Sequence, residues 1–451
     1  MRLTKWRPRD AGWHFGSHRG ASIGELTVRQ EAPRLISACS VRCSCFQRNI
    51  LILIFLMATS SPMLQRIAPP RVECRCSGGP REMGLTQGTG LSEKIRGSYQ
   101  SLRSLEALRL EQPWWLPYEF FLKLAERKSE KSLVAALRQS NPAMLARMQG
   151  IAEGAGLSLR SVCLMNAMEA FIGSVKGRIA VPPIGACSAL AVRRSRSRTG
   201  EPIIARNFDY LPLFQPFYIL RESRPRNGLR SLDFAAAPQA GTVDGVNEKG
   251  LAITVNYAFV TDSGPPNQVI TMLIADALAS CATVTEAVRR ITATPRWGAG
   301  MLMLADASGD LASVELSNTR AGVRRPATGT DWLLFTNVCL CPETCAVQVS
   351  DSATYSEKAP SPLRGGSVLQ PHKDRARRFE ELIQKQSSIG PDELAAVLAD
   401  HGPSGVPDGT SPCVHTAYFN TTATLQWFPS RRSVRASYTA ACAAQYVEIA
   451  L

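Results

Sequence analysis

The chain has 451 residues, of which 45% are hydrophobic and 20% charged, so it has the composition of an ordinary globular protein with material for a sizeable core. Its formal charge of +15 could suggest a nucleic-acid or membrane partner, but Met1–Glu82 alone carries 13 Lys and Arg against 5 Asp and Glu, about half of the excess. Because the remainder is only mildly basic and has no zinc-finger spacing, we expect no nucleic-acid partner.

Residues 1–83 are rich in arginine and have no sustained hydrophobic period. One apolar run, Ile50–Ala58, follows basic residues and precedes small ones. It is too short to cross a bilayer, which takes about 20 residues, but it matches the apolar part of a secretory signal. We interpret 1–83 as a basic leader and expect export to the periplasm or the medium. The alternatives are a true start downstream of Met1, a segment that is not a signal, or a leader that tethers the protein to a membrane.

Residues 84–186 are predicted to be a helical segment. Apolar residues recur at three- and four-residue spacing in Ser129–Gln139, Pro142–Gly156 and Gly154–Gly173. The aromatic stretch Pro113–Phe121 is expected to pack in the interior, with a substrate or membrane surface as the alternative.

After Pro183 the pattern changes to strands, interrupted by two helical stretches. The predicted strands lie within Cys187–Val192, Pro202–Tyr210, Leu251–Val260, Ala299–Leu316, Trp332–Val338 and Val414–Phe428. The helices lie within Val269–Ile291 and Asp374–Gln386, with turns at Asp306–Asp310 and Asn420–Thr422 and a loop at Ser356–Ser367. Strands in hairpins with helices between them predict antiparallel sheets covered by helices, an α+β fold.

Eight of the 13 cysteines lie beyond the leader, and three of these form the stretch "CLCPETC" at Cys339–Cys345. This stretch lacks the paired C-x-x-C knuckles of structural zinc sites, so we expect a disulfide or solitary thiols there and no metal. Another cysteine, Cys187, follows two small residues in "PPIGACSALAV". A free cysteine that begins an apolar strand is most often a small core residue.

Five segments, in order, resemble a known family: "GACSALAV", "GEPIIARNFDY", "GVNEKGLAITVNY", "LLFTNV" and "DRARRFEEL". They are similar to the motifs of N-terminal-nucleophile (Ntn) hydrolases of the acyl-coenzyme A:6-aminopenicillanic acid acyltransferase type, relatives of the choloylglycine hydrolases. The helical stretch Met148–Phe171 also resembles the propeptide of that group. The resemblance covers Pro142–Phe428 and implies a four-layer αββα sandwich at 187–451, preceded by a helical propeptide at 84–186.

In such enzymes the chain cuts itself before the nucleophile, here between Ala186 and Cys187. The new α-amino group has a reference pKa of about 7.7–8.0, so it can act as general base for its own thiol. This chemistry needs no catalytic histidine. None of the five histidines pairs with Cys187 by motif (His14, His18, His372, His401 and His415), and His415 is expected to be a packing residue in a strand.

The resemblance also implies roles for other residues. Arg206 and Asp209 match the pair that holds the amine of the nucleophile and one end of the substrate. Asn256 and Asn337 match the asparagines of the oxyanion hole, where a donor contributes roughly 3–4 kcal/mol in comparable sites. Arg375 matches the arginine at the start of the late helix.

The sequence departs from the family pattern at two positions. Ala186 stands where the acyltransferase commonly has glycine, and Asp374 stands where a serine is usual. We expect an amidase that forms an acyl-enzyme on Cys187 from a small acyl amide or thioester, uses no cofactor, and keeps its small and large chains associated. The alternatives are acyl transfer to an amine, or a binding protein that retains the fold without catalysis.

Overall fold

A computed structural model of the chain describes residues 67–174 and 185–451. Most of the expected leader, including Ile50–Ala58, lies outside these ranges. Within them, no helix has both the length and the apolar character required to cross a bilayer.

Two sheets form the centre of the fold. The eight-stranded sheet has the order β1-β4-β5-β6-β7-β8-β9-β10, and the six-stranded sheet has the order β11-β2-β3-β12-β13-β14. The strands of the first are β1 Val72–Gly78, β4 Tyr218–Pro225, β5 Ser231–Ala236, β6 Asp244–Asn247, β7 Ala252–Asn256, β8 Gly300–Ala305, β9 Leu311–Leu316 and β10 Ala321–Arg324. Those of the second are β2 Ala186–Val192, β3 Ile203–Tyr210, β11 Trp332–Phe335, β12 Asn420–Phe428, β13 Ser433–Ser437 and β14 Val447–Ala450. Neighbouring strands are antiparallel except for the parallel pair β1 and β4.

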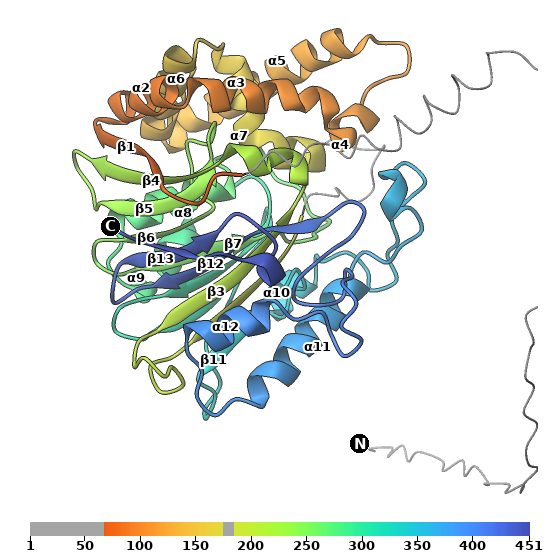
Figure 1. The fold of residues 1–451 in the computed structure, drawn as a ribbon. Helices are drawn as coiled ribbons and strands as arrows, with labels where there is room; N and C mark the ends of the chain where they lie inside the picture. The colour runs from red at the N-terminus through yellow and green to blue at the C-terminus, as the bar shows by residue number, and fades with distance from the viewer. Residues whose placement is uncertain (1–66, 175–184) are drawn as a thin grey trace, which may run out of the picture. The chain divides into compact units, whose positions relative to one another are not determined.

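Helices cover the outer faces of both sheets (Figure 1). The helices of the N-terminal segment are α2 Pro80–Gly90, α3 Ser92–Ser101, α4 Glu106–Leu110, α5 Tyr118–Ser140, α6 Pro142–Ala155 and α7 Leu159–Ser174. The later ones are α8 Ile270–Ser280, α9 Val284–Ala293, α10 Pro342–Cys345, α11 Gln370–Gln384 and α12 Pro391–Leu398. Four 3₁₀ turns join elements at Leu102–Ser104 (η1), Pro212–Phe217 (η2), Ser361–Leu363 (η3) and Ala441–Ala443 (η4).

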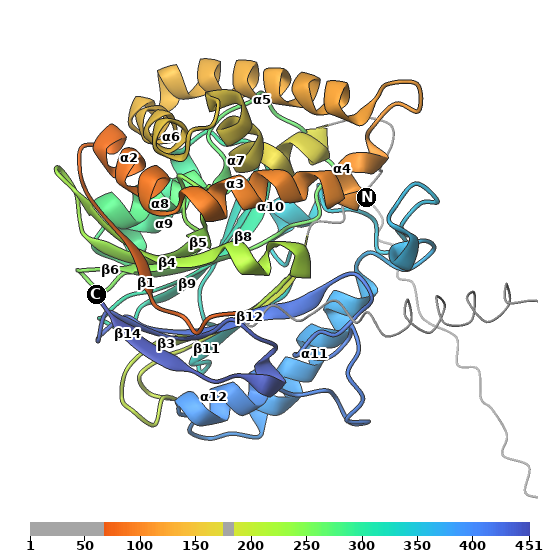
Figure 2. The same cartoon turned by 45° about the horizontal axis from the view of Figure 1, so that its top comes forward.

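The alternation of side chains along each strand builds the layers. In β2, Ala189 and Ala191 join the core between the sheets, while Leu190 and Val192 pack with α11 and α12. In β8, Met301 and Met303 belong to the same inner core, and Leu302 and Leu304 pack with α8 and α9. Figure 2 shows the helices α11 and α12 and the N-terminal helices on opposite sides of the sheets. The predicted αββα fold of antiparallel sheets is confirmed.

The N-terminal segment is part of this fold and begins earlier than the sequence suggested. Val72–Gly78, within the expected leader 1–83, forms β1 beside β4, and Cys74 and Cys76 of this strand are buried. The boundary at 83 is therefore too far along the chain. The one arginine of this strand, Arg75, lies between the two buried cysteines and is exposed.

The predicted helical stretch 269–291 is confirmed as helical. It is divided into two helices, because Thr283 caps α9 by accepting a hydrogen bond from Glu286 N.

Three smaller expectations were wrong. Trp114 and Trp115 are 93% and 66% exposed, so much of the aromatic stretch lies on the surface and not in the interior. Asn420–Thr422 begins β12 and is not a turn. His415 lies in the chain before β12, in an isolated bridge, and not in a strand.

Candidate active site

Cys187 is the second residue of β2 and only 3% exposed. The residue two positions before it, Gly185, has a φ of +112°, a conformation that residues with a side chain rarely adopt, and an added Cβ would lie 3.3 Å from the Tyr210 ring. Burial raises the pKa of the Cys187 thiol to about 12, so in the uncut chain the thiol is protonated at neutral pH.

Cys187 and Arg206 face the inner core, toward the eight-stranded sheet. The Arg206 guanidinium donates from Nη2 to Cys187 Sγ at 3.1 Å and from Nη1 to Asp244 Oδ1, which comes from β6 of the other sheet. The side chains of Arg206 and Asp244 are fully buried and form an ion pair. A guanidinium against the sulfur stabilises a thiolate once the proton leaves.

Asp209 lies beside the peptide bond that precedes Cys187, because it pairs with Ala186 between β2 and β3. Thr421 of β12 donates to Asp209 Oδ1 at 2.6 Å, and Arg375 Nη1 lies 3.5 Å from Oδ2. Burial raises the pKa of the Asp209 carboxyl to about 6, and the charge of Arg375 opposes this shift. The carboxylate is therefore ionised at neutral pH.

Arg375, on α11, is buried in the site. Its Nη2 atom donates to Asn337 Oδ1 at 3.0 Å, lies 3.4 Å from the carbonyl oxygen of Cys187 and contacts His372 Nδ1 at 2.7 Å. Asp374, the departure from the family pattern, bonds instead to Gln370 of the same helix. The unusual neighbour therefore leaves Arg375 where the motif predicted it.

Asn256 is the last residue of β7, Asn337 lies just beyond the end of β11, and each donates to a backbone carbonyl next to the other. Asn256 Nδ2 donates to Thr336 O, and Asn337 Nδ2 donates to Tyr257 O, each at 2.8 Å. Asn337 Oδ1 also accepts from the backbone N of Cys187 at 2.9 Å. A side-chain amide has two N–H groups, so each asparagine keeps a second donor beyond its carbonyl bond.

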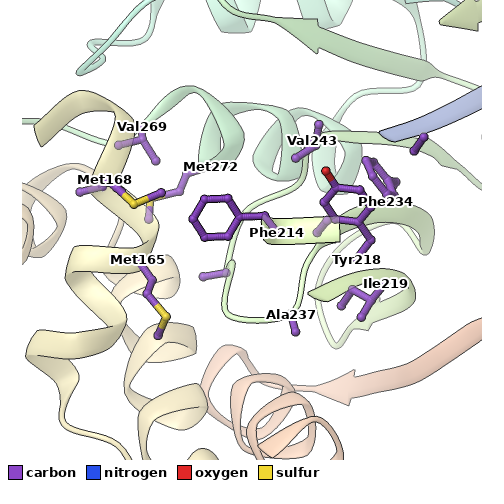
Figure 3. Packing of buried hydrophobic residues seen from close by; sticks show 14 of the residues in the cluster. Met165, Met168, Phe214, Tyr218, Ile219, Phe234, Ala237, Val243, Val269 and Met272 are labelled. Atoms are coloured by element: carbon purple, nitrogen blue, oxygen red, sulfur yellow. The ribbon is translucent and has the colours of Figure 1, made fainter. Parts of the chain in front are cut away.

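An apolar cavity of about 100 Å³ opens beside the Cys187 thiol. Its walls come from both sheets and from α7, and include Met165, Met168, Phe208, Phe214, Tyr218 and Phe234. Figure 3 shows Met165 and Met168 on α7 beside Phe214, with Tyr218 and Phe234 on the neighbouring strands. The N-terminal helical segment therefore forms one wall of the space into which the thiol faces.

The structure brings all six sequence-predicted residues together around the Ala186–Cys187 bond. Sequence reasoning missed three residues that hold them: Asp244, His372 and Thr421. Asp244 directly precedes the "GVNEKG" motif, but the sequence does not show that its carboxyl pairs with Arg206. Thr421 was missed because it lies in Asn420–Thr422, which we predicted to be a turn.

The "CLCPETC" stretch lies outside this site. Its cysteines are free thiols, as expected if they do not form a disulfide. The backbone N–H groups of Leu340 and Cys341 donate to the buried Glu315, each at 3.0 Å. The stretch therefore surrounds a carboxylate with backbone donors.

The chain matches a family model described as acyl-coenzyme A:6-aminopenicillanic acid acyl-transferase over residues 196–432, more than half of its length. The chain belongs to this family. The match includes Arg206, Asp209, Asn256, Asn337 and Arg375 but begins after Cys187, so it does not cover the candidate nucleophile of this acyltransferase-family chain. No curated protein matches the chain.

Solved structures similar to this family member include the following three. An N-acylethanolamine-hydrolyzing acid amidase ortholog from Caenorhabditis elegans is 14% identical, with a TM-score of 0.37, and the match covers 54% of this chain and 93% of that one. Penicillin V acylase from Agrobacterium tumefaciens is 19% identical (TM-score 0.39; 59% and 86% covered). A conjugated bile acid hydrolase from Clostridium perfringens is 17% identical (TM-score 0.36; 59% and 92% covered).

Proposed function

We propose that the chain is a self-processing cysteine Ntn hydrolase that cuts itself between Ala186 and Cys187 and then cleaves a linear amide. The observation that carries the proposal is the set of contacts around Cys187. One guanidinium lies against the sulfur, at 3.1 Å, and an asparagine oxygen accepts from the backbone N of the same residue at 2.9 Å.

In the first reaction, Cys187 Sγ attacks the carbonyl carbon of Ala186. The C–N bond breaks, the thiol proton passes to the nitrogen of Cys187, and a thioester joins the two residues. Water then hydrolyses the thioester, leaving a carboxylate on Ala186 and a free α-amino group on Cys187. The Asp209 carboxylate, beside this bond, stabilises the positive charge that the new amine acquires.

In the second reaction, the α-amino group takes the proton of the thiol, and the thiolate attacks the carbonyl of the substrate. Arg206 stabilises the thiolate, and the side-chain amides of Asn256 and Asn337 donate hydrogen bonds to the developing oxyanion. The amine proton then goes to the leaving amine, and the acyl group remains on sulfur until water removes it. Met165, Phe214 and their neighbours suit an acyl group of apolar chemistry.

Acyl transfer is the second candidate, because the family description names a transferase. Both reactions need the same acyl-enzyme and differ only in whether an amine or water accepts the acyl group. The two reactions are separated by adding amine nucleophiles to a hydrolysis assay and identifying the products by mass spectrometry.

The proposal is tested by intact mass and N-terminal sequencing of purified wild type, Cys187→Ala and the control Cys345→Ala, whose thiol lies in α10 outside the site. We expect wild type and control to split into two chains, the larger beginning Cys-Ser-Ala-Leu, and Cys187→Ala to stay whole. Cys187→Ser, which keeps a weaker nucleophile, should cut slowly. If wild type stays whole across pH in reducing buffer and its Cys187 does not react with acyl-amide probes, a binding protein is the correct description.

A further inference from the structure

A second cluster of reactive side chains lies at the far end of α12. His401 follows this helix, Cys413 and His415 precede β12, and Cys442 belongs to η4. Their ligand atoms all lie within 4.8 Å of one another. Cys413 Sγ is 3.3 Å and Cys442 Sγ 3.5 Å from His415 Nε2.

These spacings match a tetrahedral metal site. With Zn–S bonds of about 2.3 Å and Zn–N bonds of about 2.0–2.1 Å, a sulfur and a nitrogen on one zinc ion are roughly 3.6 Å apart. The imidazole rings of His401 and His415 also pack edge to face against each other, with ring centroids 5.2 Å apart.

His401 supplies an independent observation. Its Nε2 atom is buried and has no hydrogen-bond partner among the residues that the structure describes. Burying a polar nitrogen without a partner is costly, and a bound metal ion would remove that cost. His401 is also one of the four residues whose ligand atoms lie within 4.8 Å of one another.

We propose that His401, Cys413, His415 and Cys442 bind one Zn²⁺ ion. Two thiolates and two imidazoles are a complete tetrahedral set, so the site keeps no position open for water and is structural. The four ligands come from three separate segments of the chain. Ligands so far apart in the sequence leave no metal-binding motif, and none was expected.

The ion would fix the loop that supports the active-site carboxylate. Val414 lies between two of the ligands, and its N–H donates to Thr421 Oγ1 at 2.9 Å while its carbonyl accepts from Thr421 N at 2.8 Å. The Thr421 hydroxyl in turn donates to Asp209. Zinc ligands on both sides of Val414 therefore hold Thr421 against Asp209.

The test measures metal content in untagged, full-length protein purified under reducing conditions, by inductively coupled plasma mass spectrometry. We expect about one zinc per chain in wild type and in the control Cys345→Ser, and a loss to background in Cys413→Ser and Cys442→Ser. Zinc at background in wild type would overturn the proposal.

A second measurement does not depend on the folding of the variants. Wild-type protein stripped with a chelator is titrated with Co²⁺, which replaces zinc in such sites and absorbs visible light strongly when its ligands are tetrahedral thiolates. Saturation at one equivalent, together with a rise in melting temperature, supports the site. The spectrum of hydrated cobalt throughout the titration contradicts it.

Discussion

The carboxyl group of Asp209 has no exposed surface, and its charge depends on its neighbours. Burial raises its pKa to about 6, while Arg375 and the Thr421 hydroxyl favour the ionised form. Above pH 6 the carboxylate pairs with Arg375 and can stabilise a positive charge on the nitrogen of Cys187. Below pH 6 it is neutral and does neither.

The rate of self-cleavage should therefore fall as the pH drops below about 6, approaching tenfold per pH unit. Asp209→Asn should lower the rate at neutral pH and abolish this acidic limb, because the amide does not titrate. Freshly translated chain, followed on gels through a pH series, gives both profiles. A limb that persists unchanged in Asp209→Asn would assign the titration to another group.

At the residue scale, the sequence singled out the six residues that the fold brings together because each belongs to a short motif. It did not predict Asp244 and Thr421, whose roles depend on contacts between strands far apart in the chain. Arg206 reaches Asp244 across the two sheets, and Asp209 reaches Thr421 across a strand pair. Pairing of this kind is decided by the tertiary fold and has no local signature.

At the scale of elements, the close packing of α2 against α6 depends on glycine. An added Cβ on Gly84 would overlap the carbonyl oxygen of Arg147, and one on Gly150 would overlap that of Arg81. The two helices therefore touch backbone to backbone. The sequence predicted α6 from its apolar spacing, but its glycines gave no sign of the partner helix.

Gly84→Ala and Gly150→Ala should each destabilise the protein by about 1–3 kcal/mol, because the helices must separate to admit the methyl group. The matched control is Gly90→Ala, at the end of α2, where no atom lies within 4 Å of the new Cβ. It should be neutral or slightly stabilising, since alanine favours helix. Denaturant unfolding measures all three, and equal stability of the three variants would refute the backbone contact.

At the scale of the whole molecule, the N-terminal segment is bound on two sides. It supplies the edge strand β1 of the eight-stranded sheet and a wall of the cavity. Gln87 of α2 is buried and donates to the carbonyls of Ala237 and Gln239, which follow β5. The sequence predicted a helical segment here but missed the strand, because one short strand does not show its distant partner.

We therefore expect the two chains to stay together after cleavage and to co-elute in native size-exclusion chromatography. Gln87→Ala should weaken this association by about 1–3 kcal/mol, because it leaves buried partners unpaired. Gln100→Ala, at an exposed position of α3, is the control and should behave as wild type. Loss of the small chain from wild type in native buffer would contradict the prediction.

If the chain is cut as proposed, the position of β1 also determines how the protein can fold again afterwards. Before the cut, β1 and β4 are tethered, so their pairing is an intramolecular step whose rate does not depend on concentration. After the cut, the same pairing joins two molecules, and dilution works against it. The cut would thus make folding depend on the history of the chain, because the cut protein would not readily reassemble from its two separate chains. The cut protein would then persist because it unfolds slowly.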